Sequence, residues 1–208
     1  MGDRTVLCFG GSNTYGSIPG EEGGRFGRDA RWPGVLAREL GDGWHVVEEG
    51  LPGRTTVFHD PLSPHRRGAD YLPPCLASHA PLDVVVIFLG TNDLKARCAA
   101  EPSDIAEGLA VLARLALVSG SGPNGNAPHV LVLGLPRLGP VLPPDFAGAR
   151  EKAEALPPFV AQEASAAAVD VLDLSAVVAY SELDGIHLNA DGHSATGAAV
   201  ARRLVQMF

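Results

Sequence analysis

The chain has 208 residues, of which 46% are hydrophobic and 19% are charged, and its formal net charge at pH 7 is −8. This length is enough for one substantial hydrophobic core, so we expect a single domain spanning residues 1–208. The negative charge argues against a nucleic-acid or anionic-membrane partner, since either would require a basic face.

The three cysteines, Cys8, Cys75 and Cys98, have neither the spacing of a zinc site nor the even number of a disulfide framework. We interpret them as buried thiols in a reducing compartment. A strand is predicted within a few residues of the first methionine, which leaves no room for an export signal. The longest apolar run, residues 84–89, is too short to cross a bilayer. Together these features predict a cytoplasmic protein.

The first predicted strand, residues 6–9, is apolar and runs into Gly10-Gly11-Ser12, a pattern typical of a buried strand that ends in a sharp turn. A serine in such a turn is either a nucleophile or the cap of a helix, and this stretch alone leaves both interpretations open. After a glycine-rich loop, residues 32–41 predict a short amphipathic helix with proline near its start and glycine at its end. A second strand is predicted at 44–48, followed by a loop with two glycines.

The segment 57–82 is rich in proline, histidine and arginine and has no clear period, so we expect a long ordered excursion with one short helix. It carries more apolar side chains than a solvent-exposed loop normally does, which indicates a surface that is buried in a homo-oligomer. These side chains are Phe58, Leu62, Tyr71, Leu72 and Leu76.

The strand predicted at 83–89 is apolar on both faces, as a strand covered on both sides of a parallel sheet must be, and it ends at Gly90-Thr91-Asn92-Asp93. The remaining elements are predicted in the order helix, strand, helix, strand, helix, over residues 102–118, 130–133, 145–168, 171–174 and 194–207. We expect Ser103 to cap the first of these helices. The pair Pro157-Pro158 is expected to interrupt the second, because proline removes a donor and cannot continue a straight helix.

This alternation predicts an α/β protein with three layers, in which helices cover both faces of a central five-stranded parallel sheet. Ligands of such sheets bind outside the carboxyl ends of the strands. Ser12, the loop 50–53 and Asn92 all follow predicted strands, so we expect them to meet at that edge.

The tetrad Asp184-Gly185-Ile186-His187 follows the last predicted strand. A hydrolytic serine needs a histidine within hydrogen-bond reach and a carboxylate that orients the imidazole. Asp184 and His187 could serve these roles from one turn. A solvated aspartate and histidine on a surface loop explain these residues equally well when the tetrad is taken alone.

Taken together, the four blocks make the chain similar to the SGNH (GDSL-type) hydrolases. The blocks are Phe9-Gly10-Gly11-Ser12, the glycine loop 50–53, Gly90-Thr91-Asn92-Asp93 and Asp184-Gly185-Ile186-His187. Their order and separations resemble the family over nearly the whole chain, which implies its flavodoxin-like fold. Residues 48–56, 68–76 and 89–93 closely resemble the mycobacterial arylesterase/acyltransferase subgroup.

The resemblance implies a serine esterase that needs no cofactor and no metal. Ser12 would attack the ester carbonyl, His187 would take its proton and later deliver it to the leaving alcohol, and Asp184 would orient His187. The backbone N–H groups of Ser12 and Gly53 and the side-chain amide of Asn92 would stabilise the oxyanion of the tetrahedral intermediate.

The predicted partners are a small acyl (acetyl-type) ester and, as the acceptor of the acyl group, water or an alcohol. The side chains expected around Ser12 are mainly apolar: Tyr15, Leu51, Pro52, Ile186 and Leu188. The subgroup resemblance also implies a homo-oligomer and acyl transfer to alcohols.

Two residues of the nucleophile block depart from the family pattern. Gly11 stands where the family usually has aspartate, and Asn13 stands where leucine is commoner. We expect Gly11 to loosen the turn and weaken the enzyme. A silent binding protein with the same fold is an alternative, because a fold alone does not determine activity. A carbohydrate acetylesterase is another.

Two other classes of site fit the sequence poorly. Gly10-Gly11 followed by Gly16 has neither the spacing of a dinucleotide-binding loop nor that of a P-loop. Two groups of histidines could bind a metal but lack a familiar ligand spacing, and loop histidines are usually solvated. They are His59 and His65 with Asp60, and the pair His187 and His193.

Overall fold

The computed structural model describes residues 3–208, and its five parallel strands form one sheet in the order β2-β1-β3-β4-β5. The strands are β1 (Arg4–Gly10), β2 (Trp44–Gly50), β3 (Val84–Phe88), β4 (His129–Gly134) and β5 (Asp170–Asp173). Each strand lies where the sequence predicts it, apart from small differences at the ends. The predicted α/β fold with a five-stranded parallel sheet is confirmed.

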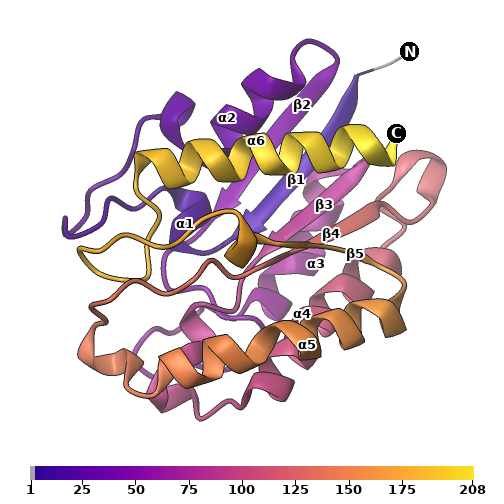
Figure 1. Cartoon of the computed structure of the whole chain (residues 1–208). Helices are drawn as coiled ribbons and strands as arrows, with labels where there is room; N and C mark the ends of the chain where they lie inside the picture. Colours follow the sequence, from indigo (N-terminus) through magenta and orange to yellow (C-terminus); the bar gives the residue numbers. More distant parts are fainter. Residues whose placement is uncertain (1–2) are drawn as a thin grey trace.

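Helices cover both faces of this sheet, which gives the three predicted layers (Figure 1). The helices are α1 (Ser12–Tyr15), α2 (Trp32–Leu40), α3 (Gly68–His79), α4 (Pro102–Leu117), α5 (Ala149–Ala167) and α6 (Ala190–Met207). α2 packs against α6 on one face, whereas α4 packs against both α3 and α5 on the other.

The register of the central strands brings three loops to one edge of the sheet. Gly10 at the end of β1 pairs with Gly50 of β2 on one side and with Phe88 of β3 on the other. The three strands therefore end at the same level. β3 is buried along its whole length, which explains its uninterrupted apolar sequence.

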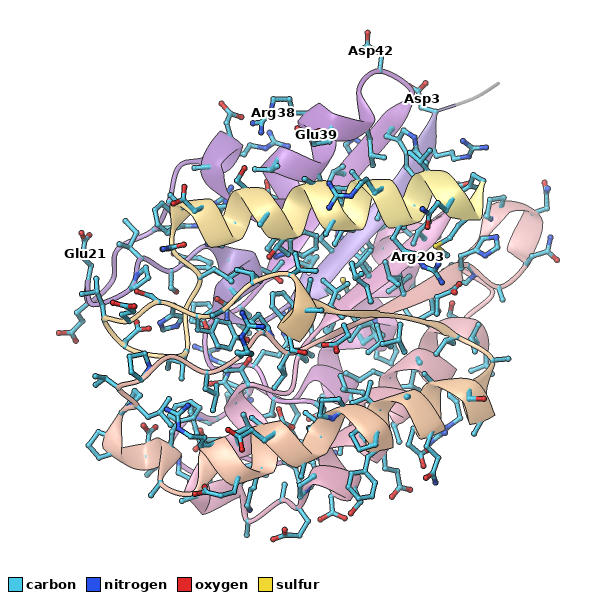
Figure 2. The ribbon with its side chains drawn as sticks, in the orientation of Figure 1. Asp3, Glu21, Arg38, Glu39, Asp42 and Arg203 are labelled. Carbon is cyan, nitrogen blue, oxygen red and sulfur yellow. The ribbon has the colours of Figure 1, made fainter. Side chains whose placement is uncertain are left out.

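Charged side chains lie mostly on the outside of the molecule. Figure 2 shows Glu21 on a loop at the left edge of the molecule, and Asp3 and Asp42 at its top. Within residues 3–208, no helix combines the length and the apolar character that crossing a membrane requires.

The N-cap of α4 and the start of α6 differ from the predictions. The N-cap of α4 is Glu101 and not Ser103, because Glu101 and Asp104 bond to each other's backbone N–H in a capping box. α6 begins four residues earlier than predicted, since the Asn189 side chain accepts a hydrogen bond from the backbone N–H of Gly192 at 2.8 Å and caps the helix there.

The expected interruption at Pro157-Pro158 is wrong, because α5 continues through both prolines. A proline in a helix leaves the carbonyl four residues earlier without its donor. Here those carbonyls belong to Ala153 and Glu154, two residues that line a surface cleft. α5 also begins at Ala149 rather than at 145, since Pro144–Phe146 form a separate 3-10 turn.

The segment 57–82 contains one helix, α3, as expected, but its apolar residues are not all exposed. Leu72 is 0% exposed and Leu76 is 1% exposed, so both belong to the core rather than to a free surface. Leu62 and Tyr71 remain exposed. Of the three cysteines, Cys98 is only half-buried, which corrects the expectation of three buried thiols.

Candidate active site

Ser12 is the first residue of α1, and Gly11 alone separates it from the end of β1. The helix takes Gly11 as its N-cap, whose backbone oxygen accepts hydrogen bonds from the N–H groups of Thr14 and Tyr15 at 3.1 and 3.0 Å. The Ser12 hydroxyl is therefore not used to cap a helix and is free to interact across the edge of the sheet.

The hydroxyl of Ser12 lies within hydrogen-bond distance of His187. Ser12 Oγ is 3.0 Å from His187 Nε2, and His187 Nδ1 is 2.8 Å from Asp184 Oδ2. With Nδ1–H donating to the carboxylate, Nε2 is the acceptor for the serine proton. This arrangement can deprotonate a serine hydroxyl and hold the resulting imidazolium beside a carboxylate.

The Asp184 carboxylate is held by its own loop and by the loop before α2. It accepts hydrogen bonds from the backbone N–H groups of Ile186 and His187, at 3.2 and 3.1 Å, and from that of Gly20 at 3.2 Å. Partial burial raises the pKa of Asp184, but the hydrogen bonds and charge of His187 and these backbone donors outweigh burial and leave the pKa below its usual value. Asp184 is therefore ionised at neutral pH.

Gly53 and Asn92 border the same cleft as Ser12 and could donate to an oxyanion. One N–H of the Asn92 amide donates to the backbone oxygen of Arg54 at 3.0 Å, which orients the amide and leaves its other N–H for a ligand. Gly53 has φ +79°, a left-handed conformation that favours glycine.

Arg54 joins the ends of β1 and β2 beneath this loop. It is 3% exposed, its Nη1 donates to the backbone oxygen of Gly10 at 3.0 Å, and its guanidinium carbon lies 4.2 Å from the centre of the Phe9 ring. Burial lowers the pKa of Arg54 to about 10, so the side chain stays charged at neutral pH. Sequence reasoning missed this role, which depends on contacts between two strands.

Asp93 anchors the Asn92 turn from below. It is 0% exposed and accepts hydrogen bonds from the backbone N–H and the hydroxyl of Thr56, at 2.9 and 2.6 Å. Burial raises the pKa of Asp93 to about 6, although the Thr56 hydrogen bonds oppose this shift. The contact ties the loop that carries Gly53 to the loop that carries Asn92.

Asn13 was noted in the sequence only as a departure from the family, but it bridges two parts of the site. It is 4% exposed, its Nδ2 donates to the backbone oxygen of Ile186 at 3.0 Å, and its Oδ1 accepts from the backbone N–H of Leu188 at 2.8 Å. These are the residues on either side of His187. In the sequence, the only sign of this bridging role is that a polar residue directly follows the serine.

Ser12 and His187 open into a cleft of about 520 Å³. Tyr15, Pro52 and Ile186 line it as predicted, but two other predicted lining residues do not. Leu51 is not part of the lining, and Leu188 is 0% exposed because its side chain points into the core.

One wall of this cleft is charged, which the sequence did not indicate. Lys95 and Asp145 line the cleft. Behind them, Asp60 pairs with both Lys95 and Arg97, and Arg97 also pairs with Asp145. The prediction that the side chains around Ser12 are mainly apolar is therefore wrong for this wall.

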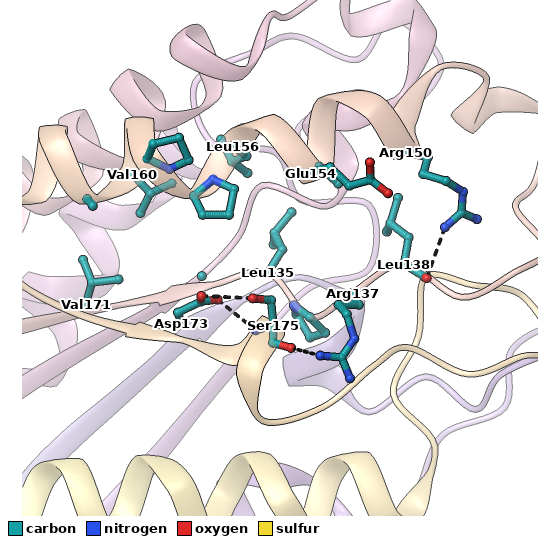
Figure 3. Close-up of a pocket in the computed structure, with 16 residues that line it drawn as sticks. Leu135, Arg137, Leu138, Arg150, Glu154, Leu156, Val160, Val171, Asp173 and Ser175 are labelled. Atoms are coloured by element: carbon teal, nitrogen blue, oxygen red, sulfur yellow. Dashed lines mark hydrogen bonds between the residues drawn. The ribbon is translucent and has the colours of Figure 1, made fainter.

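A larger cleft of about 640 Å³ lies between α5 and the ends of β4 and β5 (Figure 3). Leu135, Leu156, Val160 and Val171 form its apolar part, and Arg137 and Arg150 stand at one end. None of the site residues predicted from the sequence lines it. The chemistry of Ser12 therefore belongs to the smaller cleft.

Neither group of histidines considered as metal ligands forms a cluster of three possible ligand side chains among residues 3–208. Asp60 is engaged by cations, whereas His193 is 0% exposed and its Nδ1 accepts a hydrogen bond from the backbone N–H of Trp32 at 3.2 Å. His193 is thus a core residue rather than a solvated one. Burial, with smaller contributions from Arg31 and His187, lowers its pKa to about 4.

One group of three possible metal ligands occurs within residues 3–208: Glu49, Cys75 and His79, whose ligand atoms lie within 4.8 Å of one another. His79 Nε2 is already 2.9 Å from Glu49 Oε1. None of the three lines the cleft that holds Ser12.

Comparison with known proteins defines the family of the chain. The sequence model of the GDSL-like lipase/acylhydrolase family matches residues 8–195. The chain belongs to this family. No curated protein sequence matches the chain.

Solved structures of full length are also similar to the chain. An aryl esterase from M. smegmatis is 41% identical, with a TM-score of 0.93, and the match covers 99% of this chain and 100% of that one. Est24, a carbohydrate acetylesterase from Sinorhizobium meliloti, is 39% identical with a TM-score of 0.93 over the same shares. A second carbohydrate acetylesterase family member from Sinorhizobium meliloti is 33% identical, with a TM-score of 0.90 and 98% of each chain covered.

Proposed function

We propose that residues 1–208 form one catalytic domain, a serine esterase that hydrolyses small acyl esters through an acyl-enzyme. The observation that carries this proposal is the chain of two contacts, 3.0 Å from Ser12 Oγ to His187 Nε2 and 2.8 Å from His187 Nδ1 to Asp184 Oδ2, at the wall of a cleft. Membership of a lipase/acylhydrolase family and similarity to aryl and carbohydrate esterases support the same conclusion.

In the proposed mechanism, His187 takes the proton of Ser12 as the serine oxygen forms a bond to the ester carbonyl carbon. The carbonyl oxygen becomes an oxyanion, to which the backbone N–H groups of Ser12 and Gly53 and the free N–H of Asn92 donate. The tetrahedral intermediate then loses the alcohol, which takes the proton from His187, and leaves an acyl group on Ser12. Asp184 stays ionised and stabilises the imidazolium in both steps.

Release of the acyl group repeats these steps with a second nucleophile. His187 takes a proton from water or from an alcohol, whose oxygen attacks the acyl carbonyl, and Ser12 recovers its proton on leaving. Water yields the free acid and an alcohol yields a new ester. We include acyl transfer in the proposal because the cleft also carries apolar side chains, Tyr15, Ile18 and Ile186, which can hold an alcohol close to the acyl carbonyl.

Labelling with a serine-directed phosphonate tests the proposal directly. We expect the wild type and the surface variant S194A to be labelled, and S12A to remain unlabelled. S12A and H187A should each lose about four orders of magnitude in kcat for phenyl acetate, with unchanged circular dichroism. Addition of a chelator should leave the wild-type rate unchanged. Labelling of S12A at the wild-type level would contradict the assignment of the nucleophile.

A further inference from the structure

Lysine is rare in this chain and one of its two copies lies in the cleft. The 16 cationic side chains include only two lysines, Lys95 and Lys152. Lys152 lies in the N-terminal part of α5 and donates to the backbone oxygen of Ala100 at 2.6 Å. Lys95, with 9% of its side chain exposed, lines the 520 Å³ cleft beside Asn92. An ammonium is strongly hydrated, so burying it is costly unless its donors are used.

The carboxylate beneath Lys95 is largely occupied by another cation. Asp60 has a side chain that is 0% exposed, and both of its oxygens accept from Arg97, at 2.7 Å from Nε and 2.9 Å from Nη2. The hydrogen bond from Arg97 is the main reason that the pKa of Asp60 lies well below its usual range. Asp60 is thus an ionised anchor held in place by Arg97.

Lys95 retains donors that the protein does not use. Its Nζ is 3.3 Å from Asp60 Oδ2, and within residues 3–208 this is the one hydrogen bond that the ammonium makes. An ammonium has three N–H donors. The remaining donors are available to a ligand in the cleft, because Asp60 fixes the position of the ammonium while Arg97 takes most of that carboxylate's capacity.

The neighbours of Lys95 suit a polyhydroxylated ligand. Asp145 adds a carboxylate to the same wall, and its Oδ2 is 3.0 Å from Arg97 Nη1. The ring of Phe146, whose centre is 6.0 Å from Lys95 Nζ, is buried next to the ammonium, and Ile18 and Pro143 add apolar surface to the cleft. Hydroxyl groups can accept from an ammonium and donate to a carboxylate, while the C–H groups of a sugar pack on apolar side chains. An unsubstituted aryl group uses only the apolar surface and leaves the buried donors unpaired.

We propose that Lys95 is a specificity residue that donates hydrogen bonds to hydroxyl oxygens on the alcohol side of the ester, so that acetyl esters of sugars or similar polyols are preferred over simple aryl acetates. This inference rests on the proposed esterase function. Sites built to hydrogen-bond a substrate hydroxyl discriminate strongly against analogues that lack it, because their polar groups are then left unpaired.

The test compares kcat/KM for 6-O-acetylglucose and for phenyl acetate, with acetate release as the readout for both. In K95M, which keeps the aliphatic length and removes the donors, we expect the ratio of the sugar ester to the aryl ester to fall about tenfold or more. The matched control K152M removes the other lysine and should leave the ratio and both rates unchanged. An unchanged ratio in K95M would overturn the proposal, including the case in which both rates fall by the same factor.

A second variant covers the case in which K95M does not fold. K95R keeps a cation against Asp60 but moves its N–H groups, so the ratio should fall here as well, and an unchanged ratio would count against the proposal. Failure of the esterase function itself has a different signature. In that case the wild type releases acetate from neither ester, or S12A releases it as fast as the wild type.

Discussion

The carboxamide of Asn13 accepts a hydrogen bond from the backbone N–H of Leu188 at 2.8 Å, although the two residues are 175 positions apart. The same side chain donates to the backbone oxygen of Ile186. Asn13 therefore holds both neighbours of His187 while its own neighbour, Ser12, carries the hydroxyl that His187 contacts. Both partners of the 3.0 Å contact between Ser12 and His187 are positioned by one buried amide.

Replacing Asn13 by alanine should therefore lower kcat more than it changes KM. We expect kcat to fall about tenfold to a hundredfold, because small displacements of catalytic groups are costly in rate while the walls of the cleft remain in place. Steady-state kinetics with phenyl acetate measure both constants. N126A, at an exposed position in the loop before β4, is the control and should behave as the wild type. If folded N13A has the kcat of the wild type, the loop that carries His187 keeps its position without Asn13.

Gly11→Asp should raise kcat. Gly11 has φ −92°, which any L residue can adopt, and a Cβ added there would meet its nearest neighbour, Asn92 Nδ2, at an ordinary 3.5 Å. A carboxylate at this position can hold the turn by hydrogen bonds, which would fix the position of Ser12 more firmly. G11A, which adds only the Cβ, separates rigidity of the backbone from the effect of the carboxylate. If G11D is slower than the wild type, the turn works best with glycine and our interpretation is wrong.

His193 should make the protein less stable in acid. Its pKa is lowered from 6.5 to about 4 by burial, so the unfolded chain takes up a proton at a higher pH than the folded one. The contribution of His193 to stability is complete above about pH 6.5 and is lost as the pH falls toward about 4. H193Q keeps an acceptor for the backbone N–H of Trp32 but cannot be protonated.

Urea unfolding at about pH 7 and about pH 4.5 measures this effect. The wild type should lose roughly 2 kcal/mol more of its unfolding free energy between these values than H193Q does. Equal losses in the two proteins would mean that His193 is not the group responsible.

Assembly should depend on exposed apolar side chains beside segments of the site. Leu183 is 72% exposed and Leu62 is 75% exposed. A Cβ added to Gly20, which lines the cleft, would lie 3.8 Å from the Leu183 side chain, and the backbone N–H of Leu62 donates to Asp60. We expect a homo-oligomer in light scattering at micromolar concentration, and a smaller particle for the double variant L62D/L183D. V118D, at an equally exposed position beyond the end of α4, should leave the mass unchanged. A monomeric wild type would refute this expectation.

Acyl transfer can be measured by supplying an activated acetate ester with a primary alcohol in dilute buffer. The partly apolar cleft should concentrate the alcohol near the acylated Ser12, so that the ratio of new ester to free acid exceeds the molar ratio of alcohol to water. The uncatalysed reaction under the same conditions is the reference. A product ratio that never exceeds the molar ratio would identify a plain hydrolase.

The sequence by itself determined the order of strands and helices, because the buried strands of a parallel sheet are continuous apolar runs and their ends carry glycine turns. It also indicated Ser12, Asn92 and the Asp184–His187 tetrad, since each follows a predicted strand and such loops meet at one edge. Local patterns are sufficient for both inferences. They failed where distant residues decide the outcome, as at the continuous helix through Pro157-Pro158 and at the buried Leu72.

Only the tertiary structure decided which polar residues support the site. Asn13 accepts a hydrogen bond from a residue 175 positions away, and Arg54 joins the ends of two strands. Asp60 lies in the irregular segment after β2, and it anchors Lys95 in the turn that follows β3. None of these side chains has a periodicity or spacing that marks it in the sequence. Their roles follow from burial, because a polar group removed from water must find its partner wherever the fold places one.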